Sequence, residues 1–408
     1  MRRITQAVII TGIALLLVLT TCSPLWQLRV RAGDTAPEPT SAAQPSGQPT
    51  AAPIPTAAPS PTAPPTAAPI PTAAPSPTAA QPDSPLGRII DGYLNDLVGA
   101  GLFQGAVLIA RDGQVLLSAG YGMADAAQGV PNTAKTRFRL ASMSKQFTAA
   151  AIMLLQARGK LDVKDPICGY LEGCPAAWRA ITIEQLLTHT SGLPNYTDFA
   201  SYDQTQMLPA TPADLIARFR DLPLLFAPGS GYMYENSDYV LLGAIIERVA
   251  GQPYADFMRG AIFEPLQMRD SGLALGAAPG EGQALGYRVF GEPAPPLDPS
   301  TLFSAGGLYS TVEDLYRWDQ ALYTTQLLPA PLLDAMWTPH ARNYGYGWKI
   351  DTAAGHRKIS HPGLMDGFET MIARYPDDHV TVIVLSNMSG ANIGAITDYL
   401  ASLMFESW

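Results

Sequence analysis

The segment from residue 35 to residue 85 limits most strongly what this chain can fold into. It contains 16 of the 37 prolines of the chain, no aromatic residue, and no lysine or arginine. A segment of this composition cannot bury enough apolar surface to offset the entropy lost on ordering it. The stretch 50–56 returns as 66–72, which is typical of a low-complexity spacer. We therefore expect the folded part of this 408-residue chain to be residues 86–408.

Residues 1–26 have the pattern of an export signal. Two arginines near the start are followed by an uncharged apolar run over residues 7–19. Three interpretations are open: a cleaved signal, a lipoprotein signal lipidated at Cys22, and an uncleaved anchor extending to Trp26, which is long enough to span a membrane. Residues 27–85, which we call the stalk, would then extend up to about 150 Å from that membrane. We expect an extracytoplasmic protein of the cell envelope, or a secreted one.

Charge and cysteine content exclude several classes of partner. A net charge of −9 without basic clusters argues against nucleic acid and against an anionic membrane surface. Beyond Cys22 the cysteines are Cys168 and Cys174, and in an exported protein their spacing favours a small disulfide loop over two free thiols. No cofactor or metal is implied, since the five histidines show no zinc-site spacing. We expect a monomer that acts on a small-molecule or peptide substrate.

Hydrophobic periodicity predicts an α/β (α+β) domain assembled from both ends of residues 86–408. Two β-rich runs joined at Asp112 and Gly113 are typical of a hairpin. The simplest arrangement is one antiparallel sheet with the terminal helices on one face and a helical subdomain beside it. The expected helices cover 89–97, 214–220, 239–249, 312–323 and 391–405, and the expected strands cover 105–110, 114–118, 345–350, 370–374 and 379–385.

Ser142 and Lys145 stand three residues apart at the start of an apolar run that ends at Arg158 and Gly159. Residues at this spacing share one helix face, so the amine can take the proton that a serine must lose to become a nucleophile. A nearby helix N-terminus favours negative charge at the seryl oxygen. Taken alone, the pair also fits a serine N-cap followed by a surface lysine. The chemistry therefore needs further partners.

Two later segments supply such partners. Tyr234 and Asn236 lie in a turn that leads into a helix. His361 and Gly363 lie at the end of a predicted strand whose backbone is left accessible by glycines. In order, Ser-x-x-Lys, Tyr-x-Asn and His-x-Gly resemble the three signatures of the serine β-lactamase and penicillin-binding protein superfamily. Within it, the chain is similar to the class C β-lactamase-related branch, which also holds D-Ala-D-Ala carboxypeptidases, D-aminopeptidases and esterases. The resemblance covers about 86–408 and includes 186–194 and 304–311.

This resemblance implies a β-lactamase/transpeptidase-like fold and a serine hydrolase that works through an acyl-enzyme on an amide, peptide or ester. Ser142 would attack the acyl carbon, while Lys145 or Tyr234 serves as the main base, a choice that stays open. Tyr234 would be a phenolate or share the proton of Lys145. It would then protonate the leaving group and later activate water.

The resemblance also implies substrate-binding residues. Asn236 would donate to the substrate amide or orient the active-site lysine. The backbone N–H groups of the nucleophile and of Leu364 would form the oxyanion hole. His361 takes the place of the lysine found in β-lactamases, next to Gly363. Outside this set, we expect His189 to be a structural hydrogen-bonding residue, and Gly306 and Gly307 to form a tight turn rather than a ligand contact.

Three departures from the family pattern predict the substrate class. Pro362 lacks the hydroxyl that commonly helps to hold a substrate carboxylate. Glu235 and Asp366 add carboxylates that would repel an anion. We expect a site poorly matched to β-lactams and better suited to a neutral or cationic ester or amide, unless upstream cations or a protonated His361 offset this. The alternatives are a binding or sensor module that acylates without efficient turnover, a true class C-like β-lactamase, and a stalked structural protein.

Overall fold

The computed structural model describes residues 84–406, apart from residues 275, 277–278 and 290. The predicted export signal (1–26) and nearly all of the stalk (27–85) lie outside the described residues. Among the helices of the described part, none is long and apolar enough to cross a membrane. The fold below is that of the predicted domain.

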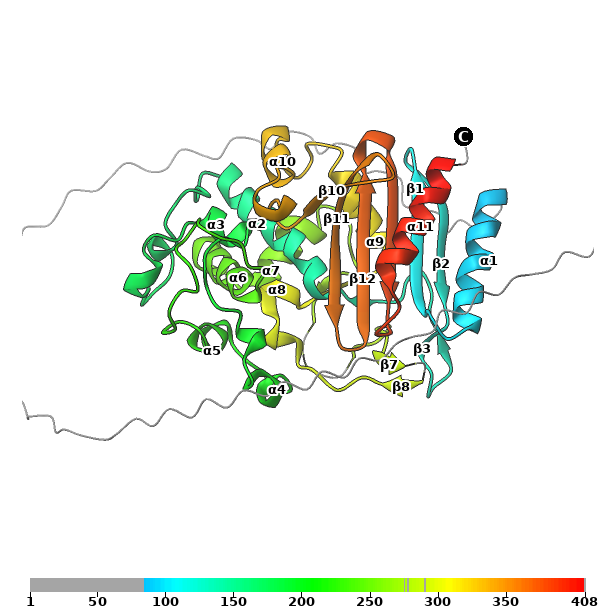
Figure 1. The fold of residues 1–408 in the computed structure, drawn as a ribbon, viewed down its shortest axis with the longest axis horizontal. Helices are drawn as coiled ribbons and strands as arrows, with labels where there is room; N and C mark the ends of the chain where they lie inside the picture. Colours follow the sequence, from blue (N-terminus) through cyan, green and yellow to red (C-terminus); the bar gives the residue numbers. More distant parts are fainter. Residues whose placement is uncertain (1–83, 275, 277–278, 290, 407–408) are drawn as a thin grey trace, which may run out of the picture. The chain divides into compact units, whose positions relative to one another are not determined.

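A six-stranded antiparallel sheet combines strands from both ends of this domain, as the sequence predicted (Figure 1). Its two ends meet where β1 pairs with β13, with Val107 opposite Val384. Both strands are almost completely buried, because each face of the sheet is covered. In spatial order the strands are β10 (Lys349–Ala353), β11 (His356–Met365), β12 (Phe368–Tyr375), β13 (Val380–Ser386), β1 (Gly105–Arg111) and β2 (Gln114–Tyr121).

Alternate side chains of β1 point into two different cores. Val107 and Ile109 pack with the terminal helices α1 (Pro85–Gly99) and α11 (Ile393–Glu406) on one face. Ala106 and Leu108 belong to the second core, on the opposite face. That core includes α9 (Val312–Ala321) and α2 (Ser144–Ala157), and it continues into the helical subdomain. The helix α2 lies between the sheet and the subdomain, which explains why it is apolar and buried over most of its length.

The helical subdomain lies beside the β10 edge of the sheet (Figure 1). Its core is continuous with the residues around α2. The helices there are α3 (Ile183–Leu187), α4 (Tyr202–Thr205), α5 (Pro212–Ala217), α6 (Asn236–Ala250), α7 (Tyr254–Met258), α8 (Phe303–Gly306) and α10 (Ala330–Met336). Short strands complete the domain: β5 (Phe138–Arg139), β9 (Leu308–Ser310) and β6 (Gly272–Leu273) in one sheet, β3 (Met123–Asp125) with β4 (Val130–Pro131), and β7 (Tyr287–Val289) with β8 (Glu292–Pro293).

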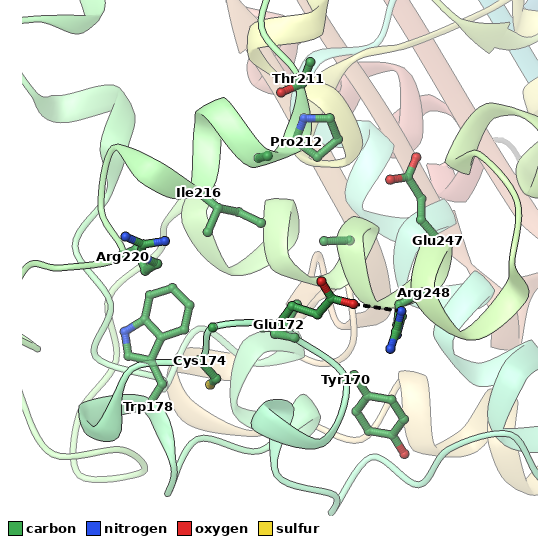
Figure 2. A pocket seen from close by; sticks show the side chains of 14 residues that line it. Tyr170, Glu172, Cys174, Trp178, Thr211, Pro212, Ile216, Arg220, Glu247 and Arg248 are labelled. Atoms are coloured by element: carbon green, nitrogen blue, oxygen red, sulfur yellow. Dashed lines mark ion pairs between the residues drawn. The ribbon is translucent and has the colours of Figure 1, made fainter. Parts of the chain in front are cut away.

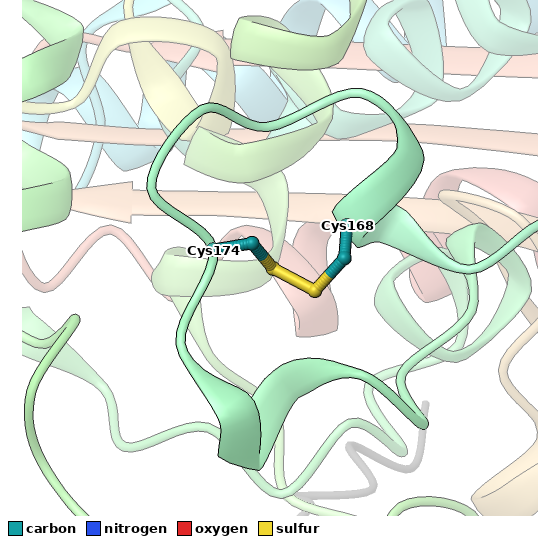
Figure 3. Close-up of a disulfide and its surroundings, with 2 residues drawn as sticks. All are labelled: Cys168 and Cys174. Carbon is teal, nitrogen blue, oxygen red and sulfur yellow. A yellow bond between two sulfur atoms is a disulfide. The ribbon is translucent and has the colours of Figure 1, made fainter.

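Cys168 and Cys174 are joined by a disulfide, as expected (Figure 3). The bond closes a short loop before α3, on the surface of the subdomain. Seven residues of the chain are thereby tied into one ring.

Two strand predictions were wrong in detail. The expected strand at 345–350 begins only at Lys349, because Gly345 and Gly347 lie in a loop that packs against neighbouring backbone. His361 was expected at a strand end, yet β11 continues to Met365. Pro362 is tolerated inside β11 because β10 pairs with β11 only as far as residue 360, so no strand pairs with that side of β11 at Pro362.

Candidate active site

Ser142 lies in a tight turn immediately before α2. This 3₁₀ turn, η1 (Ala141–Met143), carries Ala141 at φ 48°, a left-handed conformation that costs energy in a residue with a Cβ. The serine was expected near a helix N-terminus, and the structure places it two residues before the first residue of α2. Backbone strain of this kind is typical of functional sites.

The turn that carries Ser142 is held directly against the sheet. Thr370 Oγ1 of β12 donates a hydrogen bond to the carbonyl of Leu140 at 2.8 Å. A Cβ on Gly363 of β11 would stand 2.0 Å from the same carbonyl oxygen, so only glycine permits this approach. Packing therefore accounts for Gly363, and its contact with substrate stays a prediction.

The amine of Lys145 is completely buried and points at the nucleophile. Its Nζ lies 3.2 Å from Ser142 Oγ, 2.7 Å from Asn236 Oδ1 and 2.9 Å from the carbonyl oxygen of Ala305. Burial lowers the pKa of Lys145 to about 7, although Asp238 acts in the opposite direction. The two carbonyl oxygens can only accept, so they take two amine hydrogens. In the neutral amine this leaves the lone pair for the proton of Ser142.

Asn236 is the first residue of α6, and hydrogen bonds from both its side chain and its backbone fix the orientation of its side-chain amide. Its Nδ2 donates to Thr197 Oγ1 at 3.0 Å, and its backbone N–H donates to Asn195 Oδ1 at 3.0 Å. The remaining oxygen therefore faces Lys145. Of the two roles predicted for Asn236, this geometry favours the orientation of the lysine.

Tyr234 contacts both catalytic candidates, and its surroundings favour the protonated phenol. Lys145 Nζ lies 4.9 Å from the centre of its ring. Burial raises the pKa of Tyr234, and a hydrogen bond with Ser142 offsets only part of that rise. The predicted phenolate is therefore disfavoured, which leaves Lys145 as the better base. Tyr234 also lines a hollow of about 520 Å³ together with Tyr232 and Tyr344.

His361 is buried behind the site rather than exposed in it. Only 1% of its surface is accessible, and it does not line either hollow beside the nucleophile. Its Nδ1 lies 2.6 Å from the carbonyl oxygen of Pro362, and its Nε2 lies 2.8 Å from the hydroxyl of Tyr344. Burial lowers the pKa of His361 to about 3. A protonated His361 that offsets a substrate anion, one of the sequence-based expectations, is therefore disfavoured.

Ser142, Asn236 and the exposed side chain of Leu364 line a common cavity of about 200 Å³. Much of its wall is apolar, as at Leu297. Gly306, expected to form only a tight turn, ends α8 and lines this cavity as well. Ser142 lines this cavity, whereas Tyr234 lines the hollow of about 520 Å³ described above. Ser142 and Tyr234 therefore lie between the two spaces. A substrate could thus extend on both sides of the nucleophile.

The two added carboxylates do not act as the sequence suggested. Glu235 is completely buried, and its Oε1 accepts a hydrogen bond from Ser191 Oγ at 2.9 Å. Its backbone is extended, so its side chain points opposite to those of its two neighbours and away from the cavity. Asp366 does line the cavity, but it pairs with Arg288 at 2.8 Å. Of the two expected carboxylates, only Asp366 therefore lies at the cavity, and its charge is paired.

Another pocket, of about 350 Å³, lies beside the disulfide loop and contains none of the predicted site residues (Figure 2). Trp178 and Ile216 line it, and Glu172 forms an ion pair with Arg248 at 3.0 Å across it. No serine, histidine or lysine lines its wall, so it offers no chemistry like that at Ser142. Within residues 84–406, leaving out the four undescribed positions, no three His, Cys, Asp or Glu side chains converge in a way that could hold a metal.

Sequence reasoning missed the aromatic cluster behind Tyr234. His189, expected to be structural, is completely buried, and its ring centre lies 4.4 Å from that of Tyr234 and 4.8 Å from that of Tyr344. The available signal was the alternation of glycine and aromatic residues over 344–348. A Cβ on Gly347 would stand 2.7 Å from the carbonyl oxygen of Lys145, so this alternation marks a close backbone approach and not a strand.

Known proteins share this architecture. A family model described as Beta-lactamase matches residues 90–402. The chain is 33% identical to penicillin-binding protein 4* of Bacillus subtilis (strain 168), over 70% of this chain and 68% of that protein. A penicillin-binding protein from Bacillus halodurans is similar in structure, with 29% identity, a TM-score of 0.68, and coverage of 77% of this chain and 98% of that one. A D-stereospecific amidohydrolase from Streptomyces sp. matches with 27% identity and a TM-score of 0.64, over 76% and 96% of the two chains.

Proposed function

The chain belongs to the beta-lactamase family, within the serine β-lactamase and penicillin-binding protein superfamily. On that premise, we propose that it is a serine hydrolase. It would act on an amide, peptide or ester through an acyl-enzyme at Ser142. The observation that carries this proposal is the placement of Lys145. Its amine has two acceptors for its hydrogens and the seryl oxygen at 3.2 Å for its lone pair. A surface lysine after a helix cap would show none of these contacts.

In the proposed reaction, Lys145 takes the proton of Ser142 while Oγ bonds to the acyl carbon. The backbone N–H groups of Ser142 and Leu364 would stabilise the oxyanion, a contribution of about 3 kcal/mol for each donor. The bond to the leaving group then breaks, and that group receives a proton from Tyr234, which recovers one from Lys145. Water, losing a proton to the same residues, releases the acid and restores Ser142.

We propose a substrate that is neutral or cationic near the reacting carbonyl. Pro362 offers no hydroxyl, and His361 is neutral and buried, so neither provides a group for a substrate carboxylate. The wall around Leu297 and Leu364 suits an apolar acyl group. The Streptomyces neighbour, a D-stereospecific amidohydrolase, supports testing D-amino acid amides first.

We further propose that the enzyme acts outside the cytoplasm. Residues 1–26 would direct export or anchor the chain, residues 27–85 would serve as the stalk, and residues 86–408 would work as a monomeric hydrolase domain. Composition and the apolar run near the start of the chain support this arrangement.

The test is covalent labelling with a fluorophosphonate, followed by a panel of p-nitrophenyl esters, D-amino acid amides and a D-Ala-D-Ala peptide. Labelling should be lost in Ser142→Ala and kept in Ser201→Ala, which changes an exposed serine. A burst of product without turnover would favour the sensor module. Hydrolysis of a chromogenic cephalosporin at a rate typical of resistance enzymes would favour a true β-lactamase and contradict the proposed substrate class.

A further inference from the structure

Two carboxyl groups lie buried close to Lys145 and His189, and the reaction above does not use them. Glu235 and Asp238 are both 0% exposed and in hydrogen-bonding contact with each other. Within the described residues, Glu235 Oε2 and both oxygens of Asp238 receive no hydrogen bond from an N–H or hydroxyl group. Two adjacent carboxylates cannot both stay ionised in such surroundings, so the pair must hold at least one proton.

The groups around the pair do not assign the proton to one acid. Ser191 Oγ accepts from the backbone N–H of Leu193 at 3.0 Å, which leaves its own proton for Glu235 Oε1. Ser191 also favours the ionised form of Asp238, whose Oδ2 lies 3.3 Å from Nδ1 of His189. That nitrogen already accepts from the backbone N–H of Glu235 at 3.4 Å. Ser191 thus favours charge on Glu235, whereas Lys145 favours charge on Asp238, so neither acid alone is singled out to hold the proton.

The pair acts on the general base. Burial lowers the pKa of His189, as do Lys145 and His361, so His189 is neutral. Among the groups around the pair, the amine of Lys145 is then the one that becomes a cation. Negative charge on Asp238 favours the protonated form of Lys145, which is the form that results when the amine takes the proton of the nucleophile. The titratable groups that face the pair are Lys145 of α2, His189 of the segment after α3, Asp198 of η4 (Tyr196–Asp198) and Tyr239 of α6.

We propose that Glu235 and Asp238 share one proton and form a positioning unit that carries a single negative charge close to Lys145. The proposal rests on the proposed function, because the charge matters when Lys145 becomes a cation during acylation. Neither acid lines the cavity at Ser142, so both act through the lysine and not on substrate. The carboxylate that departs from the family pattern at position 235 thereby gains a role inside the protein.

A cycle of three variants tests the shared proton through the pH dependence of kcat/KM on a p-nitrophenyl ester. In Glu235→Gln or Asp238→Asn, the new amide donates to the remaining carboxylate, which ionises and keeps the charge. Each single variant should leave the acid limb of the profile in place. The double variant should move that limb to lower pH by about one unit, because the cation of Lys145 loses its stabilisation. Glu292→Gln, which changes an exposed residue, is the matched control.

Two results would overturn the proposal. Equal, additive shifts in the single variants would mean that each acid carries its own charge. An unmoved limb in the double variant would mean that the pair carries none. Where the double variant does not fold, the single variants decide, since a downward shift in either one contradicts a shared proton.

Thermal unfolding tests the pair without any catalysis. Burial raises the pKa of both acids above the 4.5 and 3.8 usual for glutamate and aspartate. The stability that this proton provides is complete below those values and is lost as pH rises through the raised ones. The Tm of the wild type minus that of the double variant should therefore fall between pH 5 and pH 9. A Tm difference that stays constant with pH would contradict the shared proton of the acid pair. A wild type that is inert toward all esters would contradict only the proposed function.

Discussion

The hydroxyl of Tyr344 lies 2.8 Å from Nε2 of His361, so both ring nitrogens of this histidine have a hydrogen-bond partner inside the protein. A carbonyl oxygen can only accept, so the 2.6 Å contact with Pro362 places a proton on Nδ1. Burial disfavours the cation, and in the neutral ring Nε2 is the acceptor. Where the lysine of β-lactamases offers a cation, this protein offers a neutral imidazole that is already fully engaged.

We therefore expect His361 to stay neutral, as the Nδ1–H tautomer, from pH 5 to pH 8. Burial lowers its pKa to about 3, so at pH 5 only about one molecule in a hundred would be protonated there. The measurement is ¹⁵N NMR of the histidine rings, with His361→Gln to assign the signal. A cationic ring at pH 5 would contradict this tautomer and reopen the case for anion recognition.

Lys145 should set the acid limb of the pH profile. Because burial lowers its pKa to about 7 and the neutral amine is the base, kcat/KM should rise as pH increases through about 7. Lys145→Met fills the same volume without an amine, and we expect kcat/KM to fall by roughly 10²- to 10⁴-fold. Lys160→Met, at an exposed lysine beyond the end of α2, should leave the rate unchanged. A limb that persists in Lys145→Met at reduced rate would assign it to another group.

Gly363→Ala should disturb the turn that carries the nucleophile. Its Cβ would stand 2.0 Å from the carbonyl oxygen of Leu140 and 2.4 Å from Thr370 Oγ1, so the backbone must shift. We expect a loss of about 1–3 kcal/mol in the free energy of unfolding, together with slower labelling of Ser142. Gly92→Ala in α1 meets no atom within 4 Å and should be neutral or slightly stabilising. Chemical denaturation compares the two, and equal effects would rule out the close approach.

Removing the disulfide should lower stability without affecting the chemistry. For a ring of this size, the loss of loop-closure entropy in the unfolded chain amounts to about 2 kcal/mol. Cys168→Ser combined with Cys174→Ser should therefore lower Tm, and reductant should lower the Tm of the wild type but not of the variant. Neither cysteine lines the cavity at Ser142, so kcat/KM should be maintained. A parallel loss of activity would show that the loop is coupled to the active site.

Sequence patterns were sufficient where the relevant geometry is local. The i, i+3 spacing of Ser142 and Lys145 brings their side chains together on any helical backbone, and Nζ indeed lies 3.2 Å from Oγ. The alternation of residues in the terminal segments and the hairpin at Gly113 likewise led to the antiparallel sheet that the structure shows. These features depend on neighbours a few residues apart, which the chain itself holds in place.

Charge and exposure were decided only by tertiary structure. Glu235 looked like a charge in the cavity, but the packing of α6 buries it against Ser191. Lys145 becomes a base near neutral pH because residues 91 and 160 positions away in the chain enclose its amine. Desolvation depends on every segment that surrounds a group, and those segments meet only in the folded protein. The sequence alone thus determined which reactive groups stand together, whereas the fold determined which of them carry a charge and which can meet a substrate.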